Sequence, residues 1–285
     1  MFDHNETLAE ARARNVRDAL FEDIGRGDWT AQLVPQRPVR ARVRVREDAV
    51  LCGRDWFDAC MHGVDPATRV HWHYAEGDDM RADSFVCDID ADARALLTAE
   101  RPALNFLQLL SGTATITRRH VRAIEGVSPN QNGCVVPDTR KTIPGLRQAQ
   151  KYAVRTGGGA NQRLALWHGI LIKENHIAAA GGVAQALANA RALNAGVDIQ
   201  IEVERLDQLR EALDHGATSV LLDNFDLQRT RDAVALTAGR ALLETSGGVT
   251  LAQMHDIAAT GVDRISVGKL TKDLIAVDFS LRVVG

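Results

Sequence analysis

Hydrophobic and polar positions follow different patterns in the two parts of the chain. Between residues 38 and 46, small apolar residues alternate strictly with arginines, which predicts a half-buried strand with a basic outer face. We expect this face to be solvated or to contact another subunit. His71 and His73 share one face of a second predicted strand, and we interpret them as surface residues because no further metal ligands accompany them.

The stretch that begins at Glu100 has helical periodicity. Apolar residues recur every three or four positions from Ala103 to Ile124, and Pro102 suits the first position of a helix. We therefore predict a long helix that connects two domains and begins near Pro102. Arg101 would then lie at the helix N-terminus, where the dipole favours an anion; a pair with Glu100 is the alternative.

From residue 133 the pattern changes to six short apolar runs separated by amphipathic segments, which predicts parallel βαβ units. No GxGxxG follows the first run, so a closed barrel is favoured over an open dinucleotide-binding sheet. Six runs are fewer than the eight of a standard barrel, which implies a smaller or incomplete one. The runs are CVV (134–136), ILIK (170–173), IQIEVE (199–204), SVLLDN (219–224), ALLETSGG (241–248) and RISVGK (264–269).

Polar residues stand at the end of every one of these runs. Because the catalytic groups of parallel barrels lie at the carboxyl ends of the strands, we expect a functional site there. The polar ends are, in chain order, Asp138, Arg140 and Lys141; Lys173, Glu174 and Asn175; Glu202 and Glu204; Asp223 and Asn224; Glu244, Ser246, Gly247 and Gly248; and Ser266, Gly268 and Lys269.

Carboxylates within the third and fourth runs suggest a metal. Glu202 and Glu204 alternate with apolar residues, so both are expected to point into the barrel. Glu202 and Asp223, from neighbouring runs, could share a Mg²⁺ ion that keeps several waters. An internal salt bridge to Lys141 or Lys173 is the alternative, because buried carboxylates need cations.

Glycines follow the last two runs, as SGG at 246–248 and VGK at 267–269, and GGG at 157–159 precedes Arg163. Glycine lets the backbone approach an anion closely, so these loops predict a site for a phosphorylated sugar. Several cations accompany them, which implies substrates with many negative charges. These cations are Arg140, Lys141, Arg163 and Lys173, with Arg101 arriving from the helix end.

Composition narrows the class of protein. The 285 residues are 45% hydrophobic and 25% charged, which is ordinary for a soluble enzyme. The formal net charge of −3 disfavours nucleic acid as the main partner. Neither an apolar signal segment nor a membrane span stands out, and the four cysteines form no CxxC pair. We expect a cytoplasmic protein with reduced thiols and no membrane partner.

Seven motifs occur in an order that resembles the quinolinate phosphoribosyltransferase family: ERPALNFLQLLSGTAT, DTRKTIPGLR, KYAVRTGGGANQR, LIKENHI, EVE, LLDNF and ETSGG. The resemblance, from about residue 20 onward, implies an N-terminal α/β sandwich (1–112, completed by 271–285) and a six-stranded incomplete α/β barrel (113–270), as in type II phosphoribosyltransferases. It also implies a homodimer with shared active sites, or a higher oligomer. The implied reaction converts quinolinate and phosphoribosyl pyrophosphate into nicotinate mononucleotide, pyrophosphate and CO₂, with Mg²⁺.

The resemblance also assigns roles to residues. Quinolinate would be held by Arg101 of the partner subunit and by Arg140, Arg163 and Lys173, with Thr139 and Gln162 beside them. Catalysis would fall on Lys141, Lys173, Glu202 and Asp223, of which Glu202 and Asp223 would hold the metal. Phosphoribosyl pyrophosphate would be held by Lys141, Glu202, Asp223, Ser246, Gly247, Gly248, Ser266 and Gly268.

Two positions depart from the family pattern. Gln162 stands where the family usually has histidine, and His168 where it often has aspartate. Gln162 can still donate a hydrogen bond but cannot carry charge. Two alternatives therefore remain open: a paralogue that acts on another acceptor, which Gln162 favours, and a non-catalytic homologue. The intact TRKT, LIKENH and EVE segments speak against the paralogue, and the retained barrel-mouth charges speak against the non-catalytic homologue.

Overall fold

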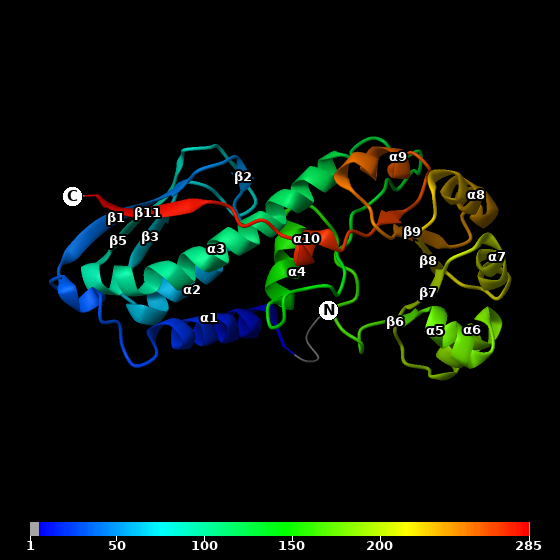
Figure 1. The fold of residues 1–285 in the computed structure, drawn as a ribbon, viewed down its shortest axis with the longest axis horizontal. Coiled ribbons are helices and arrows are strands. Elements are labelled where there is room, and N and C mark those ends of the chain that lie inside the picture. Colours follow the sequence, from blue (N-terminus) through cyan, green and yellow to red (C-terminus); the bar gives the residue numbers. More distant parts are fainter. Residues whose placement is uncertain (1–5, 285) are drawn as a thin grey trace. The chain divides into compact units, whose positions relative to one another are not determined.

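The computed structural model describes residues 6–284, which form two compact units (Figure 1). Unit 1 combines the chain up to Arg118 with Thr142–Gly158 and the segment from Leu270 onward. Unit 2 combines Arg119–Lys141 with Gly159–Lys269. The barrel domain expected at 113–270 includes 142–158, whereas in the structure this segment belongs to unit 1.

Unit 1 is built on a four-stranded antiparallel sheet in the order β11-β1-β5-β3. Its hydrophobic core joins the inner face of this sheet to apolar residues of α1, α2 and α3. The C-terminal strand β11 pairs with β1 and so completes the sheet. The strands are β1 (Pro38–Val45), β3 (Arg69–Trp72), β5 (Phe85–Asp92) and β11 (Phe279–Val284), with β2 (Ala49–Val50) and β4 (Asp79–Met80) as a separate pair; the helices are α1 (Leu8–Ile24), η1 (Ala31–Leu33), α2 (Arg54–Val64), α3 (Ala93–Arg122), α4 (Arg147–Thr156) and α10 (Lys269–Lys272).

The alternation predicted for β1 is confirmed. Ala41, Val43 and Val45 are fully buried, and the arginines between them lie on the other face. That face is less basic than the sequence suggests, because β5 brings aspartates opposite the arginines. Arg40 Nε lies 3.1 Å from an Asp90 oxygen and Arg42 Nε 2.6 Å from an Asp88 oxygen, while the Nε2 atoms of His71 and His73 lie 3.4 and 3.1 Å from the same two aspartates.

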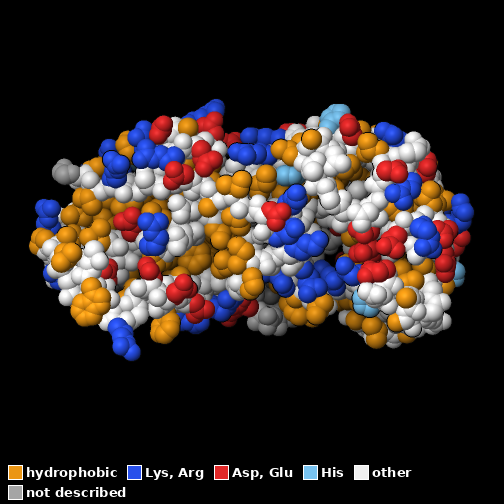
Figure 2. All heavy atoms as spheres, in the orientation of Figure 1, with side chains coloured by type: hydrophobic (Ala, Val, Ile, Leu, Met, Phe, Trp, Pro, Cys, Tyr) orange, Lys and Arg blue, Asp and Glu red, His pale blue; other side chains and the backbone are white. Residues whose placement is uncertain are grey.

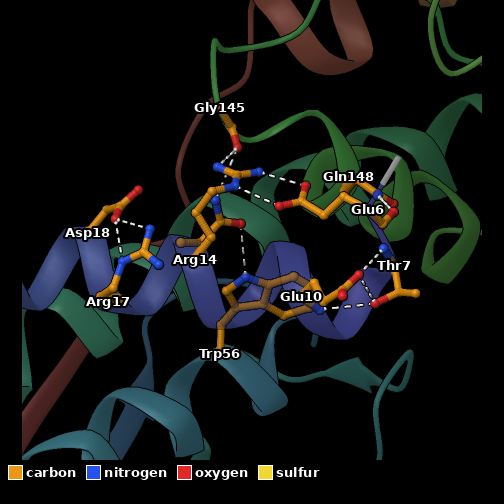
Figure 3. A network of polar contacts seen from close by, with 10 residues as sticks. Glu6, Thr7, Glu10, Arg14, Arg17, Asp18, Trp56, Gly145 and Gln148 are labelled. Atoms are coloured by element: carbon orange, nitrogen blue, oxygen red, sulfur yellow. Dashed lines mark hydrogen bonds and ion pairs between the residues drawn. The ribbon is translucent and has the colours of Figure 1, made fainter. Parts of the chain in front are cut away.

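Contacts of α1 explain why the segment 142–158 belongs to unit 1 (Figure 3). Asn15 Nδ2 and Arg14 Nη1 both donate to the carbonyl oxygen of Gly145, at 3.0 and 3.1 Å. Gln150, on α4, donates through Nε2 to the carbonyl oxygen of Thr271 at 2.8 Å. These bonds cross more than a hundred residues of sequence, so no local pattern announces them.

Helix α3 begins earlier than predicted. It starts at Ala93, directly after β5, because the Asp92 carboxylate accepts hydrogen bonds from the backbone N–H groups of Arg94 and Ala95. Pro102 therefore lies inside the helix. The prediction that Arg101 lies at a helix N-terminus is wrong, and the dipole argument for an anion at Arg101 no longer holds.

Unit 2 contains a five-stranded parallel sheet in the order β10-β9-β8-β7-β6. The first predicted strand, 134–136, is reduced to two isolated parallel bridges, Val135 with Arg264 and Pro137 with Ala160. Pro137 lacks the N–H group that a longer ladder needs. The strands are β6 (Ile170–Ile172), β7 (Ile199–Val203), β8 (Ser219–Asp223), β9 (Leu242–Ser246) and β10 (Arg264–Ile265); the helices are α5 (Glu174–Ala180), α6 (Val183–Ala192), α7 (Leu206–Asp214), α8 (Leu227–Thr237), η2 (Leu251–Gln253) and α9 (Met254–Ala258).

The predicted α/β class is confirmed, with an N-terminal sheet unit and a C-terminal parallel sheet accompanied by helices. On β7 the apolar residues Ile201 and Val203 are fully buried, while Gln200 and Glu202 on the opposite face line a cavity. No helix within residues 6–284 is both long enough and apolar enough to cross a membrane.

Candidate active site

A cavity of about 300 Å³ lies within unit 2 at the carboxyl ends of the parallel strands. Figure 2 shows acidic side chains gathered over the region that contains β7 and β8. Nine residues assigned to the site from the sequence line this cavity: Thr139, Arg140, Lys141, Gln162, Arg163, Lys173, Glu202, Ser246 and Ser266. The remaining lining residues are Asp138, Leu171, Gln200, Leu221 and Glu244.

Five assigned residues are not among the lining. Asp223, Gly247, Gly248 and Gly268 belong to unit 2, next to residues that do line the cavity. Arg101 belongs to unit 1, where its side chain is exposed and has no hydrogen bond or ion pair among residues 6–284. Burial raises the pKa of the neighbouring Glu100, and the positive charge of Arg101 opposes this effect.

Two guanidinium groups lie near each other on the cavity wall. Burial lowers the pKa of Arg163, and the positive charge of Arg140 lowers it further. Arg163 donates through Nη1 to the carbonyl oxygen of Gly169 at 2.8 Å. The Nε of Arg140 is buried and has no hydrogen-bond partner in the described chain. An anion placed between these groups would relieve both the repulsion and the missing hydrogen bond.

Glu202 is the carboxylate that β7 turns into the cavity. Its side chain is 13% exposed, and its Oε2 lies 3.7 Å from Lys173 Nζ. Burial raises its pKa, the charges of Asp223 and Glu174 raise it further, and Lys173 opposes both effects. The prediction that Glu204 also points inward is wrong: this residue is exposed beyond the end of β7, where its backbone N–H donates to Gln208 Oε1 at 2.9 Å.

Asp223 and the SGG loop are fixed to each other through Asn224. The Asn224 amide donates to an Asp223 oxygen at 2.8 Å, and its backbone N–H donates to the carbonyl oxygen of Ser246 at 3.0 Å. Gly247 has a φ of +101°, and a Cβ atom there would collide with the Asn224 side chain. A glycine is therefore required at position 247 for both the conformation and the close approach.

Lys141 depends on a second glycine. A Cβ atom on Gly268 would lie 3.1 Å from Lys141 Cδ and 3.7 Å from Thr139 Oγ1. Thr139 Oγ1 also accepts a hydrogen bond from the Lys141 backbone N–H at 3.1 Å. The absence of a side chain at position 268 thus lets the loop that carries Thr139 and Lys141 lie against the end of β10.

Gln162 belongs to a network of amides and carboxylates. Its backbone N–H donates to Asp138 Oδ1 at 3.0 Å, and its Nε2 donates to Glu244 Oε2 and to Gln200 Oε1. Gln200 Nε2 donates to the same Glu244 oxygen at 2.9 Å. The side-chain amide of Gln162 is therefore held by hydrogen bonds to Glu244 and Gln200, and it does not take the place of the charged histidine side chain of the family.

His168 has a local structural role. Its Nδ1 accepts a hydrogen bond from the Leu164 backbone N–H at 3.0 Å, and its ring lies edge-on to Trp167. It is not among the residues that line the cavity. His168 thus contributes to the structure of the loop between Leu164 and Gly169.

Glu244, Gln200 and Asp138 are the polar lining residues that the assigned site leaves out. Each carries a signal in the sequence: Asp138 and Glu244 end apolar runs, and Gln200 shares the strand face of Glu202. What the sequence does not give is their mutual hydrogen bonding, which joins residues 162, 200 and 244.

The carboxylates present fit a magnesium ion held by few protein ligands. In the described part of the chain, no group of three or more His, Cys, Asp or Glu side chains could enclose a metal. Glu202 and Asp223 are nevertheless close enough that the charge of Asp223 raises the pKa of Glu202. Mg²⁺ prefers one or two carboxylates with waters and substrate phosphates, so this pair is a suitable donor set.

Comparison with known proteins gives a consistent match along the chain. Residues 28–111 match the quinolinate phosphoribosyl transferase N-terminal domain and residues 113–282 its C-terminal domain. The chain is 40% identical over 281 residues to nicotinate-nucleotide pyrophosphorylase [carboxylating] of Mycobacterium leprae, covering 95% of this chain and 97% of that protein. It is 38% identical over 266 residues to the probable enzyme of that name from Bacillus subtilis, covering 93% and 90%.

A solved structure agrees with these matches. The nicotinate-nucleotide pyrophosphorylase from Francisella tularensis superposes with a TM-score of 0.93 at 41% identity, over 98% of each chain. The C-terminal domain match contains every residue that lines the cavity, and the N-terminal match contains β1, β3 and β5 of unit 1. The chain therefore belongs to the quinolinate phosphoribosyltransferase family.

Proposed function

We propose that this protein transfers the phosphoribosyl group of phosphoribosyl pyrophosphate to quinolinate with decarboxylation, giving nicotinate mononucleotide, pyrophosphate and CO₂. One observation carries the proposal: the buried, unpartnered Nε of Arg140 lies near Arg163 on the wall of a small cavity. Paired guanidinium groups with free donors are suited to a planar dicarboxylate, which they can hold bidentately.

The acceptor is held by cations of the cavity wall. The two carboxylates of quinolinate would be bound by Arg140, Arg163 and Lys173. Thr139 and Gln162 line the same part of the cavity. Fixing the acceptor in one orientation places its ring nitrogen for attack on the ribose carbon, which is the main advantage that an enzyme offers here.

The ribosyl donor lies on the carboxylate side of the cavity. Departure of pyrophosphate leaves positive charge on the ribose carbon, and Glu202 and Asp223 are placed to stabilise it. Lys141 and the loops at Ser246–Gly248 and Ser266–Gly268 would hold phosphate groups. When bound at Glu202 and Asp223, Mg²⁺ would neutralise charge on the pyrophosphate.

Loss of CO₂ follows from the first step. Once the ring nitrogen carries the ribose it is cationic, so the adjacent carbon can hold the electron pair that CO₂ leaves behind. The protein needs to keep the departing carboxylate from strong solvation, and the partial burial of Arg140 and Arg163 serves this purpose.

We further propose that the protein forms a homodimer, or a higher oligomer built from such dimers, in which Arg101 of one subunit contributes to the site of its partner. We also propose that it acts in the cytoplasm and binds neither nucleic acid nor membranes. The exposed side chain of Arg101, which has no ion pair or hydrogen bond within residues 6–284, supports this assignment. The net charge of −3 is consistent with small anionic substrates reached through a local cluster of cations.

The test is an assay of the purified chain with quinolinate, phosphoribosyl pyrophosphate and Mg²⁺. We expect quinolinate loss with equal amounts of nicotinate mononucleotide and pyrophosphate, and no turnover after chelation of the metal. Turnover with another pyridine carboxylate but not with quinolinate would replace this proposal with the paralogue. Absence of turnover with every acceptor would favour the non-catalytic homologue.

A further inference from the structure

Glu244 is a buried carboxylate on the cavity wall whose surroundings are unusual. It is 2% exposed, and both of its hydrogen-bond donors are neutral amides, Gln162 Nε2 and Gln200 Nε2. Both donate to Oε2. Within residues 6–284, Oε1 has no hydrogen-bond partner and the carboxylate has no ion pair.

The two amides stabilise a negative charge on Oε2 through hydrogen bonds but bring no positive charge to neutralise it. A buried carboxylate ordinarily has a cation beside it. Here the other charged residues that line the cavity are Asp138, Arg140, Lys141, Arg163, Lys173 and Glu202, and none of them forms an ion pair with Glu244.

A free negative charge is unfavourable to the ground state of the proposed reaction. The acceptor is a dianion and the donor carries phosphates, so a carboxylate in the same small cavity repels both. An interaction that weakens substrate binding increases the rate only if it is stronger in the transition state. Positive charge develops during this reaction, first at the ribose carbon and then on the pyridine ring.

We propose that Glu244 stabilises this developing positive charge through its free Oε1, and that Gln162 and Gln200 are positioning residues that fix the orientation of its carboxylate. The inference rests on the proposed function, because it needs a reaction with a cationic transition state. Glu244 gains and loses no proton in the cycle and forms no bond to substrate. Its effect is electrostatic and adds to that of Glu202 and Asp223.

The first test is Glu244→Gln, which keeps the shape and a hydrogen-bonding side chain but removes the charge. We expect kcat to fall at least tenfold, while the Kd of quinolinate, measured by titration calorimetry, stays the same or decreases. The charge-matched control is Glu204→Gln, at an exposed position just beyond the end of β7, which should change neither value by more than about twofold. An unchanged kcat, or a loss of quinolinate affinity as large as the loss of kcat, would overturn the proposal.

The second test distinguishes positioning from simple structural support. Gln200→Met removes one donor to Glu244 Oε2 with little change in volume, so the carboxylate should be held less firmly in its orientation. We expect kcat to fall severalfold at an unchanged Kd of quinolinate in Gln200→Met, and no further fall when Gln200→Met is combined with Glu244→Gln. Equal kcat values for wild type and Gln200→Met would contradict the positioning role.

Failure of this inference and failure of the proposed function give different results. If the wild type shows no turnover of quinolinate, the proposed function fails. If the wild type turns over and Glu244→Gln keeps its kcat, the proposed function stands and only the role of Glu244 falls.

Discussion

Arg140→Ala should weaken quinolinate binding without lowering the stability of the unliganded protein. In the described chain the Nε of Arg140 is buried and unpaired, and a buried donor without a partner costs about 1–3 kcal/mol. Its removal also relieves repulsion with Arg163. These gains offset the cavity that the truncation leaves, so we expect a melting temperature equal to or above that of the wild type.

The effect on binding has the opposite sign. Truncating one partner of a buried charge pair costs about 2–5 kcal/mol, so the Kd of quinolinate should rise about 30-fold to a few thousand-fold. Titration calorimetry gives the Kd, and thermal melts with and without quinolinate give the stability. The wild type should gain stability from the ligand, and the variant should lose that gain.

Arg231→Ala is the matched control, because this arginine is exposed on α8 and does not line the cavity. It should change neither stability nor binding beyond about 0.5 kcal/mol. Two results would refute the reasoning for Arg140: a variant that binds quinolinate within threefold of the wild type, or one whose free form melts several degrees lower. The second would show that Arg140 has a structural role that its contacts do not reveal.

Three other variants test separate parts of the proposal. Mixing inactive Arg101→Ala with inactive Lys141→Ala should restore roughly a quarter of wild-type activity if sites are shared in a symmetric dimer, and no recovery after verified subunit exchange would remove Arg101 from the partner's site. Glu202→Gln should lower turnover and raise the Mg²⁺ concentration needed for half-maximal activity, because one of the two proposed metal ligands loses its charge. The pKa of Glu202 is raised above 4.5, so folding favours its neutral form, and this contribution to stability is lost as pH rises through the folded pKa. The neutral Glu202→Gln variant should therefore be more stable than the wild type at pH 8 and equally stable near pH 4. Denaturant melts at the two pH values measure this difference. Gly247→Ala should lose about 1–3 kcal/mol of stability and most phosphoribosyl pyrophosphate affinity, whereas at Gly248, with a φ of +60° and open space around it, the same change should cost about 1 kcal/mol; equal losses would show that close packing at 247 is unimportant.

Periodicity in the sequence was enough to predict the class of fold and the end of the sheet that carries the chemistry. Alternation along residues 38–46 identified the buried face of β1, and the apolar runs identified the five strands of unit 2. Both signals work because side-chain direction in a strand repeats every two residues whatever the strand packs against. The polar residues at the ends of these runs could be gathered into one site because parallel strands end at the same edge.

The tertiary structure decided which partner each of these side chains has. The aspartates of β5 neutralise arginines of β1, and α1 draws the segment 142–158 into unit 1. Helix α3 starts at the N-cap residue Asp92, but in the sequence an aspartate is a weaker signal for a helix start than the proline ten residues later. Such choices depend on contacts between residues far apart in the chain, and local propensity does not determine them.

The candidate site shows the same division most clearly. Arg140, Lys173 and Glu202 could be chosen from residue type and strand position, but nothing local indicates that Arg140 lacks a partner for its Nε. Nor does the sequence join Gln162, Gln200 and Glu244, which come from three separate segments. Hydrogen bonding and desolvation depend on the distances between segments, and those distances are set only when the strands assemble into one sheet.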